Sequence, residues 1–205
     1  VLNTNHHPAP NETVMAKKYE TFFGGKGANQ AVGTARLGAS VYFIGSVGMD
    51  PYGQQILRNL VDENVNVGFV HEDTENATGT AYVTAAFGKN AIVVVPSANS
   101  SLATQNIDMA EKIFSTVDLV LTQLEIPMEV VENVYQKCKK YGKKLGIYAS
   151  PAAKISPEIL EYATFIIAKS NELSIIFDEE SREQTLRKYP NKLFVRADTN
   201  STIYY

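Results

Sequence analysis

Short apolar runs alternate with segments of helical periodicity along most of this chain, and this alternation constrains its fold more than any other feature. A helix is predicted over residues 28–37, a strand over 41–48 and a further helix over 53–64, whose apolar side chains fall on one stripe. The rhythm continues, with candidate elements at 117–124, 128–140, 144–149, 157–162, 164–168, 171–177 and 192–196. Repeated strand–helix units predict an α/β fold, in which a parallel sheet carries helices on its faces.

One section breaks the rhythm and predicts an antiparallel hairpin. Residues 78–96 hold two apolar runs joined by the glycine-containing turn FGKN, and both faces of this hairpin are apolar. Because exposed apolar strands tend to aggregate, such a hairpin needs a cover: a ligand, a partner chain or another sheet. Residues 12–22 have enough β-branched and aromatic side chains to add a strand beside it. We therefore expect a small β lid built from about residues 1–23 and 78–96.

The composition limits the classes of function. With 205 residues and 44% hydrophobic content, the chain is long enough for one good core, and we expect a single domain over residues 1–205. The net charge of −3 does not produce the positive potential that attracts nucleic acid. The longest apolar runs are too short to span a bilayer, so we expect no membrane partner. The single Cys138 cannot form an internal disulfide, which agrees with a reducing cytoplasm.

The stretch FFGGKGANQAV, residues 22–32, places three glycines, a lysine and an asparagine at the start of the first predicted helix. The P-loop pattern fails here because glycine follows Lys26, and the dinucleotide pattern fails because Gln30 occupies the place of its third glycine. Glycines let a ligand approach the unpaired N–H groups of a first helical turn. Lys26 donates hydrogen bonds, and Asn29 both donates and accepts. This combination suits a neutral polyol or sugar at least as well as an anion.

Each of these residues also has a purely structural interpretation. The glycines can form a tight strand-to-helix turn that binds nothing, Lys26 can be a solvated charge, and Asn29 can be an ordinary residue of the first helical turn. Asp50, before a proline, is typical of turn chemistry rather than of a catalytic group.

The run GGKGANQAVGTARLGASVYFIGSVGMDPYG, residues 24–53, resembles the N-terminal signature of the ribokinase-like (PfkB) carbohydrate kinases, glycine by glycine and through Asn29. Within that family, the form GGKGANQ is typical of the ribokinases. APNETV at 9–14 and TQLEIP at 122–127 are similar to the family patterns P-x-P-G-E-T and Q-L-E-x-P. The resemblance covers nearly the whole chain in order and spacing. It implies the family fold, a parallel-sheet sandwich with helices on both faces and a small β lid.

The resemblance implies an enzyme that transfers the γ-phosphoryl group of ATP to a sugar hydroxyl. It places Gly25, Lys26 and Asn29 on the sugar hydroxyls, with Glu125 as a further contact. The sequence supports Glu125 separately, because it follows an apolar strand at 118–124, and open α/β sheets bind ligands at the carboxyl ends of their strands. A carboxylate there can accept two hydrogen bonds from hydroxyls. The alternative is an acidic residue that favours the start of the next helix.

The residues that the resemblance places near the nucleotide depart more from the family pattern than those that it places near the sugar. The family's N-x-x-E motif, linked to metal and phosphate, implies Asn171 as a cofactor-binding residue, but Ser174 stands where its glutamate is expected, and Glu172 is out of register. The family's T-x-G-x-x-G stretch is replaced by RADTNS, residues 196–201, which has no glycine. By resemblance the cofactors are ATP and Mg²⁺, with a monovalent cation as a further candidate.

The family's catalytic base is an aspartate in a G-A-G-D motif, and no such motif occurs in residues 1–205. The family's early sugar-holding aspartate precedes the position of Val1. Both ends of the chain look cut. We therefore assign no catalytic residue within it and expect the isolated chain to be inactive, while the full-length protein is expected to be a sugar kinase.

Alternatives to a ribokinase-type enzyme stay open. The chain can be a non-catalytic sugar-binding or dimerising module of the same fold, or a kinase for another sugar, a sugar acid or a nucleoside. The apolar hairpin and the family habit of pairing lids predict a homodimer through the lid. We expect a cytoplasmic protein whose partners are a small sugar and ATP. The pair His6-His7, with Glu12 nearby, is interpreted as part of a loop, and metal-ligating residues are left unassigned.

Overall fold

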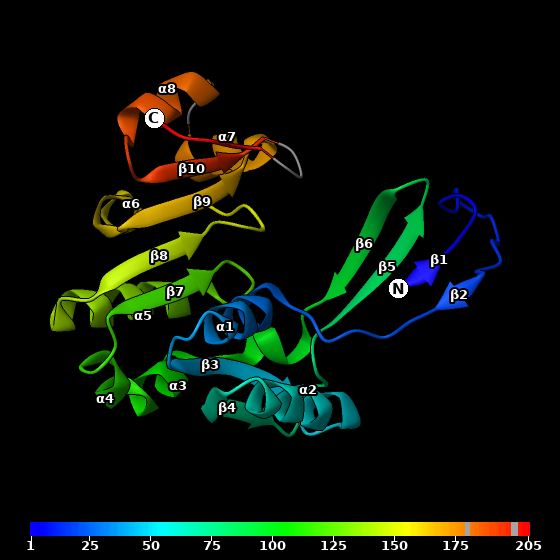
Figure 1. The fold of residues 1–205 in the computed structure, drawn as a ribbon, viewed down its shortest axis with the longest axis horizontal. Helices are drawn as coiled ribbons and strands as arrows, with labels where there is room; N and C mark the ends of the chain where they lie inside the picture. The colour runs from blue at the N-terminus through cyan, green and yellow to red at the C-terminus, as the bar shows by residue number, and fades with distance from the viewer. Residues whose placement is uncertain (179–180, 198–200) are drawn as a thin grey trace. The chain divides into compact units, whose positions relative to one another are not determined.

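The computed structural model describes residues 1–178, 181–197 and 201–205 (Figure 1). The chain forms two compact units, Val1–Ser101 and Leu102–Tyr205. Both units combine helices with parallel strand pairs, so the α/β class predicted from the sequence is confirmed. The expectation that residues 1–205 act as one domain stays a prediction.

The first unit contains two separate sheets. Its elements are β1 (Leu2–Asn3), β2 (Lys18–Tyr19), α1 (Lys26–Arg36), β3 (Val41–Gly48), α2 (Pro51–Asp62), β4 (Val65–Asp73), β5 (Thr80–Ala86), β6 (Lys89–Val95) and the 3-10 helix η1 (Ser97–Ser101). β3 and β4 pair in parallel as a two-stranded sheet. The other strands form a four-stranded sheet in the order β2-β1-β5-β6.

Helices α1 and α2 pack against β3 and β4 because their apolar side chains lie on one stripe. Ala31 of α1, Leu60 of α2 and Val65 of β4 are buried together at the centre of this cluster. Partly buried apolar side chains complete it: Ala28, Val32, Ala35, Val41, Phe43 and Val67. The small apolar residues of α1 thus form its packing face.

Local sequence sets the start of α2. The Asp50 carboxylate accepts a hydrogen bond of 2.8 Å from the Gly53 N–H, and Pro51 occupies the first helical turn. The helix therefore begins at Pro51 rather than at residue 53, where the sequence prediction starts it. The interpretation of Asp50 as a turn residue is confirmed. β4, in contrast, is missing from the sequence prediction, because Gly68 interrupts its apolar pattern.

The four-stranded sheet contains the predicted hairpin. β5 and β6 pair antiparallel up to Ala86 opposite Lys89. Phe87 and Gly88 form the turn with positive φ angles of 51° and 71°, the conformation that suits the twist of a hairpin. On its other side β5 pairs in parallel with β1, and β2 pairs with β1. The strand expected within residues 12–22 thus exists as β2, but it lies one strand further from the hairpin than the prediction placed it.

The second unit is built on a five-stranded sheet. Its elements are α3 (Thr104–Met109), α4 (Glu111–Phe114), β7 (Leu119–Gln123), α5 (Met128–Tyr141), β8 (Lys144–Tyr148), α6 (Pro157–Tyr162), β9 (Phe165–Lys169), the 3-10 helix η2 (Ser170–Glu172), α7 (Leu173–Phe177), α8 (Arg182–Lys188), β10 (Leu193–Arg196) and β11 (Thr202–Ile203). The strand order is β11-β10-β9-β8-β7; β7 to β10 are parallel, and β11 is antiparallel to β10. Within the described ranges, no helix has the length and apolar character needed to cross a bilayer.

Aliphatic side chains fill the centre of this sheet. Ile166 of β9 pairs with Ile147 of β8 on one side and with Leu193 of β10 on the other, and all three are fully buried. Near-continuous apolar strands are typical of parallel sheets covered on their faces. On the helix side, α5 buries Val130 among other residues and ends where Gly142 adopts the left-handed conformation, with φ +62°.

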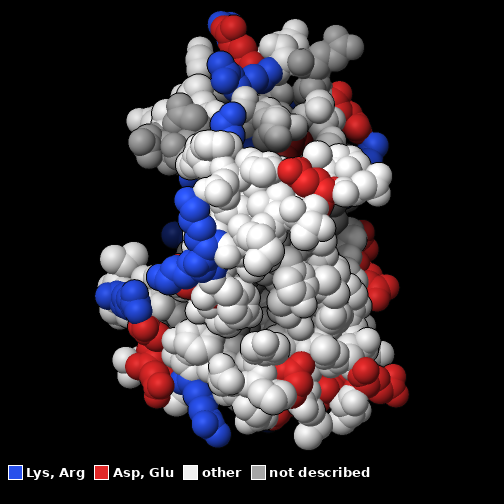
Figure 2. Space-filling model, turned by 90° about the vertical axis from the view of Figure 1, so that its right-hand side faces the viewer, with Lys and Arg blue, Asp and Glu red and all other residues white. Residues whose placement is uncertain are grey.

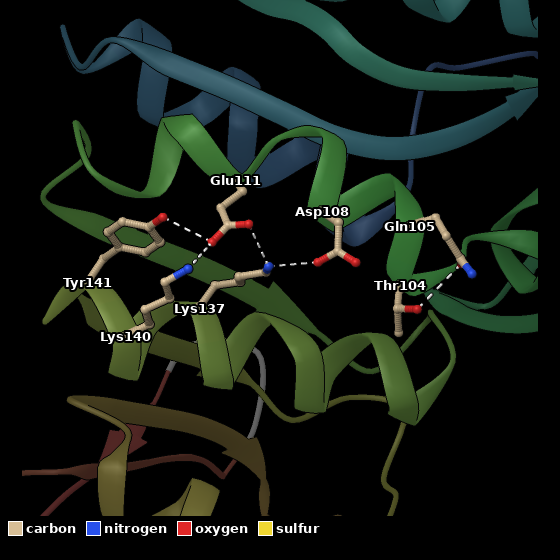
Figure 3. Close-up of polar contacts among 7 residues, drawn as sticks. All are labelled: Thr104, Gln105, Asp108, Glu111, Lys137, Lys140 and Tyr141. Carbon is tan, nitrogen blue, oxygen red and sulfur yellow. Dashed lines mark hydrogen bonds and ion pairs between the residues drawn. The ribbon is translucent and has the colours of Figure 1, made fainter.

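Ion pairs connect the short helices α3 and α4 to α5 (Figure 3). The Lys137 ammonium lies 2.7 Å from a carboxylate oxygen of Asp108 and 3.0 Å from one of Glu111. The other Glu111 oxygen lies 2.6 Å from the Lys140 ammonium and accepts a hydrogen bond of 2.9 Å from the Tyr141 hydroxyl. Hydrogen bonds from Lys140, Lys137 and Tyr141 lower the pKa of Glu111 to about 2.

Glu111→Gln is expected to make stability less dependent on pH. The folded chain lowers the pKa of Glu111 from its ordinary value of 4.5 to about 2, so its contribution to stability is present above the ordinary value and lost as the pH falls through about 2. Thermal unfolding of the parent chain and the variant between neutral and acidic pH measures this: the difference between their melting temperatures should shrink toward the acid end. Glu132→Gln, at an exposed site on α5, is the control. Equal slopes for both variants contradict the assignment.

Candidate functional site

The start of α1 presents open backbone. Gly25 caps the helix with φ +92°, a conformation that glycine adopts without strain. Beyond the chain neighbours, no atom of the described residues lies within 4 Å of the place where a Cβ of Gly24 or Gly25 would stand. The Asn29 N–H donates to the Gly25 carbonyl at 2.9 Å, which is the first hydrogen bond within the helix. The N–H groups of the first turn of a helix have no partner within the helix itself. The start of α1, which we call its mouth, therefore has room for a ligand beside Gly24 and Gly25.

Two polar side chains flank this open backbone. Asn29 is exposed, and Lys26 is half-buried at the first helical position. The positive end of the helix dipole adds to the Lys26 charge, so oxygen atoms of a ligand are favoured there. The structure thus brings Gly25, Lys26 and Asn29 together within one turn, as the spacing predicts. Their contact with a ligand stays a prediction.

Glu125 lies in the second unit, in the bend between β7 and α5. β7 ends at Gln123 and runs parallel to β8, so Glu125 follows the carboxyl end of a parallel strand, where ligands bind in this class of sheet. The helix begins three residues later, at Met128. Glu125 is half-buried. Its part in a site shared with α1 stays a prediction.

The residues predicted on the nucleotide side follow β9. Asn171, in η2, and Ser174, in α7, are exposed. Glu172, which is out of register with the family motif, accepts a hydrogen bond of 3.0 Å from the buried Ser150 hydroxyl, and its carboxylate lies 3.5 Å from the Lys169 ammonium. Its carboxylate therefore holds the segment after β8 to the end of β9.

The stretch at 196–201 lies only partly within the described residues. Arg196 ends β10, and the Ala197 N–H donates to the Ser201 carbonyl at 3.1 Å. Residues 198–200 lie outside the described part of the chain.

Among the described residues, no three His, Cys, Asp or Glu side chains are grouped so that they could hold a metal ion. His6 and Glu12 form an exposed pair with 2.7 Å between Nε2 and Oε1, and the neighbouring His7 Nδ1 lies 3.1 Å from the Thr84 hydroxyl. These contacts bind residues 6–12 to each other and to β5, in agreement with the interpretation of the histidines as part of a loop.

Two carboxylates lie at the base of the four-stranded sheet: Asp50, whose bonds to Thr78 the sequence did not predict, and Asp73, which sequence reasoning missed altogether. We call them the hinge carboxylates. Burial alone would raise the pKa of Asp50, but hydrogen bonds from Thr78 and Gly53 outweigh it and lower the pKa. The Ser101 hydroxyl and the Asn76 and Glu75 N–H groups hold the pKa of Asp73 far below its ordinary range. The Asx-turn pattern of an aspartate followed by Asn76 three residues later is the signal that could have found Asp73.

Comparison with known proteins identifies the family. Residues 1–204 match the pfkB family of carbohydrate kinases. The chain belongs to this family. The pfkB chain is 38% identical over 204 residues to a ribokinase of Bacillus subtilis and covers 70% of that protein's length. It is 34% identical over 210 residues to a ribokinase of Lactococcus lactis and covers 68% of its length.

Solved structures agree with this assignment. The pfkB chain superposes on an Arabidopsis thaliana ribokinase complexed with ribose and ATP with a TM-score of 0.82 at 27% identity, covering 100% of this chain and 73% of that one. For a Thermotoga maritima ribokinase the TM-score is 0.81 at 26% identity, with 72% of that chain covered. The expected ribokinase-like fold is thereby confirmed, and so is the expected class of protein, an enzyme of the sugar kinase type.

Proposed function

We propose that the full-length protein phosphorylates a hydroxyl of a ribose-like pentose with ATP. The observation that carries this proposal is the open space at Gly24 and Gly25, beside the Lys26 and Asn29 side chains at the start of α1. Relatives named ribokinase, and a ribokinase structure that holds ribose and ATP, support the choice of sugar and phosphate donor.

The side chains present suit a sugar with several hydroxyls. The Lys26 ammonium donates to hydroxyl oxygens, and the Asn29 carboxamide can donate to one hydroxyl while accepting from another. Glu125 accepts two hydroxyl hydrogen bonds in the proposed complex, which fixes the sugar ring in one orientation. In phosphoryl transfer, the protein contributes mainly such positioning of the reactants and neutralisation of their charge. The base that takes the hydroxyl proton is not assigned to a residue of this chain, since residues 1–205 contain no G-A-G-D motif.

Asn171 is proposed to contact ATP. It is exposed just after the carboxyl end of β9. Open α/β sheets bind their ligands at the carboxyl ends of the strands. Mg²⁺ enters with ATP as part of the substrate, because it is usually held by phosphates and one or two carboxylates rather than by a protein cage. A monovalent cation and a cytoplasmic location complete the proposal by family resemblance.

A direct test uses the full-length gene product with ATP and Mg²⁺. ADP release is measured with ribose, deoxyribose, fructose, a sugar acid and a nucleoside, each against a blank without sugar. The proposal predicts release that depends on the sugar and is fastest with ribose. Faster turnover of another substrate reassigns the specificity, and no turnover with any of them contradicts the proposed activity.

A second candidate is a non-catalytic sugar-binding module. Two observations near the expected nucleotide site favour it. Ser174 replaces the family's glutamate, and the nearby Glu172 carboxylate already contacts the Ser150 hydroxyl and the Lys169 ammonium. Calorimetry separates the candidates, because the module should bind ribose without measurable binding of ATP, whereas the kinase should bind both.

We further propose that the protein forms a homodimer through the four-stranded sheet. β6 is an edge strand, and its apolar side chains Ile92, Val93, Val94 and Val95 are all exposed. Figure 2 shows one face of the molecule with a broad area free of charged side chains. An exposed apolar strand of this length is typical of an interaction surface.

Val93→Asp is expected to weaken the dimer, because it places a charge in an apolar interface. Sedimentation equilibrium should show a dissociation constant raised about tenfold or more, the effect of burying one unpaired charge. Val61→Asp, at a similarly exposed valine on α2, is the control: the two side chains are 66% and 54% exposed. A parent protein that stays monomeric at high concentration contradicts the proposed dimer.

A further inference from the structure

Two short segments connect the β5–β6 hairpin to the rest of the first unit. Residues 74–79 lead from β4 into β5, and residues 96–101 lead out of β6 through η1. The Ala98 N–H donates to the Ala77 carbonyl at 3.0 Å, so the two segments lie side by side. A change in the direction of the hairpin relative to β4 therefore has to bend both of them.

Asp50 holds the first of these segments. Its Oδ2 accepts from the Thr78 N–H at 2.7 Å, and its Oδ1 accepts from the Thr78 hydroxyl at 2.8 Å. The Thr78 hydroxyl also accepts from the Gly48 N–H at 3.0 Å. Because Asp50 caps α2 as well, its carboxylate joins the start of a helix to Thr78, and the Thr78 hydroxyl extends this link to the end of β3.

Asp73 holds the second segment. It is only 6% exposed, and its Oδ1 accepts from the Glu75 and Asn76 N–H groups at 2.8 and 2.9 Å. Its Oδ2 accepts from the Asn76 carboxamide at 3.0 Å and also from the Ser101 hydroxyl. The end of β4 is thereby fixed to the end of η1.

Glycines make this close approach possible. A Cβ on Gly48 would lie 2.6 Å from the Asn76 carbonyl and from the Thr78 nitrogen, and one on Gly53 would lie 2.1 Å from the Gly48 carbonyl. A Cβ on Gly79 would likewise lie 2.5 Å from the Asn99 carboxamide nitrogen. Such close contacts restrict how the base of the hairpin can bend, because neighbouring atoms leave no room for a side chain at these positions.

We propose that the hinge carboxylates, Asp50 and Asp73, are positioning residues for sugar binding. Through Thr78 and Ser101 they fix the direction of the hairpin, so that the four-stranded sheet is preorganised to cover a sugar held at the mouth of α1. This inference rests on the proposed function. The hinge carboxylates touch no reacting atom, and their effect is on the population of molecules that can bind sugar.

The test uses Thr78→Val and Ser101→Ala in the full-length protein, because each removes one hydroxyl and keeps the carboxylate. The KM for the sugar is expected to rise about fivefold in each variant, since apparent affinity falls with the fraction of molecules in the competent conformation. The kcat and the KM for ATP should change less than about twofold. Thr78→Ser, which restores the hydroxyl, should return the KM for the sugar to the parent value.

Thr116→Val and Ser115→Ala are the matched controls, because each removes a hydroxyl that donates to a backbone carbonyl in the turn after α4. Hydrogen exchange provides a second measurement: amides of β5 and β6 should exchange faster in the hinge variants, while those of β8 and β9 stay unchanged. An unchanged KM for the sugar, with only a lower melting temperature or a lower kcat, overturns the proposal. If the parent protein turns over no sugar, the proposed function fails, and unchanged exchange in β5 and β6 then overturns the hinge separately.

Discussion

Asn29→Ala in the full-length protein is expected to lower kcat/KM for the sugar by about 100-fold, because the loss leaves two sugar hydroxyls without a partner in a desolvated site. The KM for ATP should stay within about twofold of the parent value, since Asn29 contacts only the sugar in this account. Stability should not fall, because alanine is the better helix former at an exposed position of α1. Steady-state kinetics with ribose and ATP varied separately measure both constants.

The control for this variant is Gln55→Ala, which removes an exposed carboxamide from α2. It should leave both constants at the parent values. If Asn29→Ala retains the parent kcat/KM, the carboxamide is an ordinary residue of the first helical turn. If both variants lose activity equally, the loss does not report on the mouth of α1.

Ile166→Ala is expected to lower the free energy of unfolding by about 2–5 kcal/mol, the usual cost of emptying a fully buried aliphatic position. Ile166 is 0% exposed on a strand with neighbours on both sides, so the sheet cannot easily close over the cavity. Urea denaturation followed by circular dichroism measures the change.

Ile166→Val is the graded control, with an expected loss of about 0.5–1.5 kcal/mol because only one methyl group is removed. A larger loss for valine than for alanine, or no loss for either, contradicts the placement of Ile166 at the centre of the sheet. Ile175→Ala, on an exposed side chain of α7 that is 53% accessible, should change stability little.

The sequence predicts the second unit better than the first. The elements from residue 128 to residue 162 lie within one residue of their predicted bounds, because apolar strands and capped helices follow each other with clear breaks. Ser156 followed by Pro157 marks the start of α6 in the sequence itself. The six-residue helix α3 escapes prediction, because Ala103 before it gives no start signal of the kind that Ser156 and Pro157 give α6.

The arrangement of the first unit depends on contacts that no local pattern reveals. β1 pairs in parallel with β5 across some eighty residues, as Leu2 opposite Thr84 shows, and sequence periodicity cannot supply such a pairing. The mouth of α1 is predictable because its glycines and polar residues are consecutive. The Asx turn of Asp73 is predictable from Asn76 three residues later, but its bond to Ser101 is not, because Ser101 approaches it only in the folded chain.

A crystal structure of the full-length protein with bound ribose tests the central claim most directly. Sugar hydroxyl oxygens are expected within hydrogen-bonding distance of the Asn29 carboxamide and of the N–H groups that follow Gly25. Ribose bound elsewhere, with the mouth of α1 filled by the protein's own side chains, would contradict it.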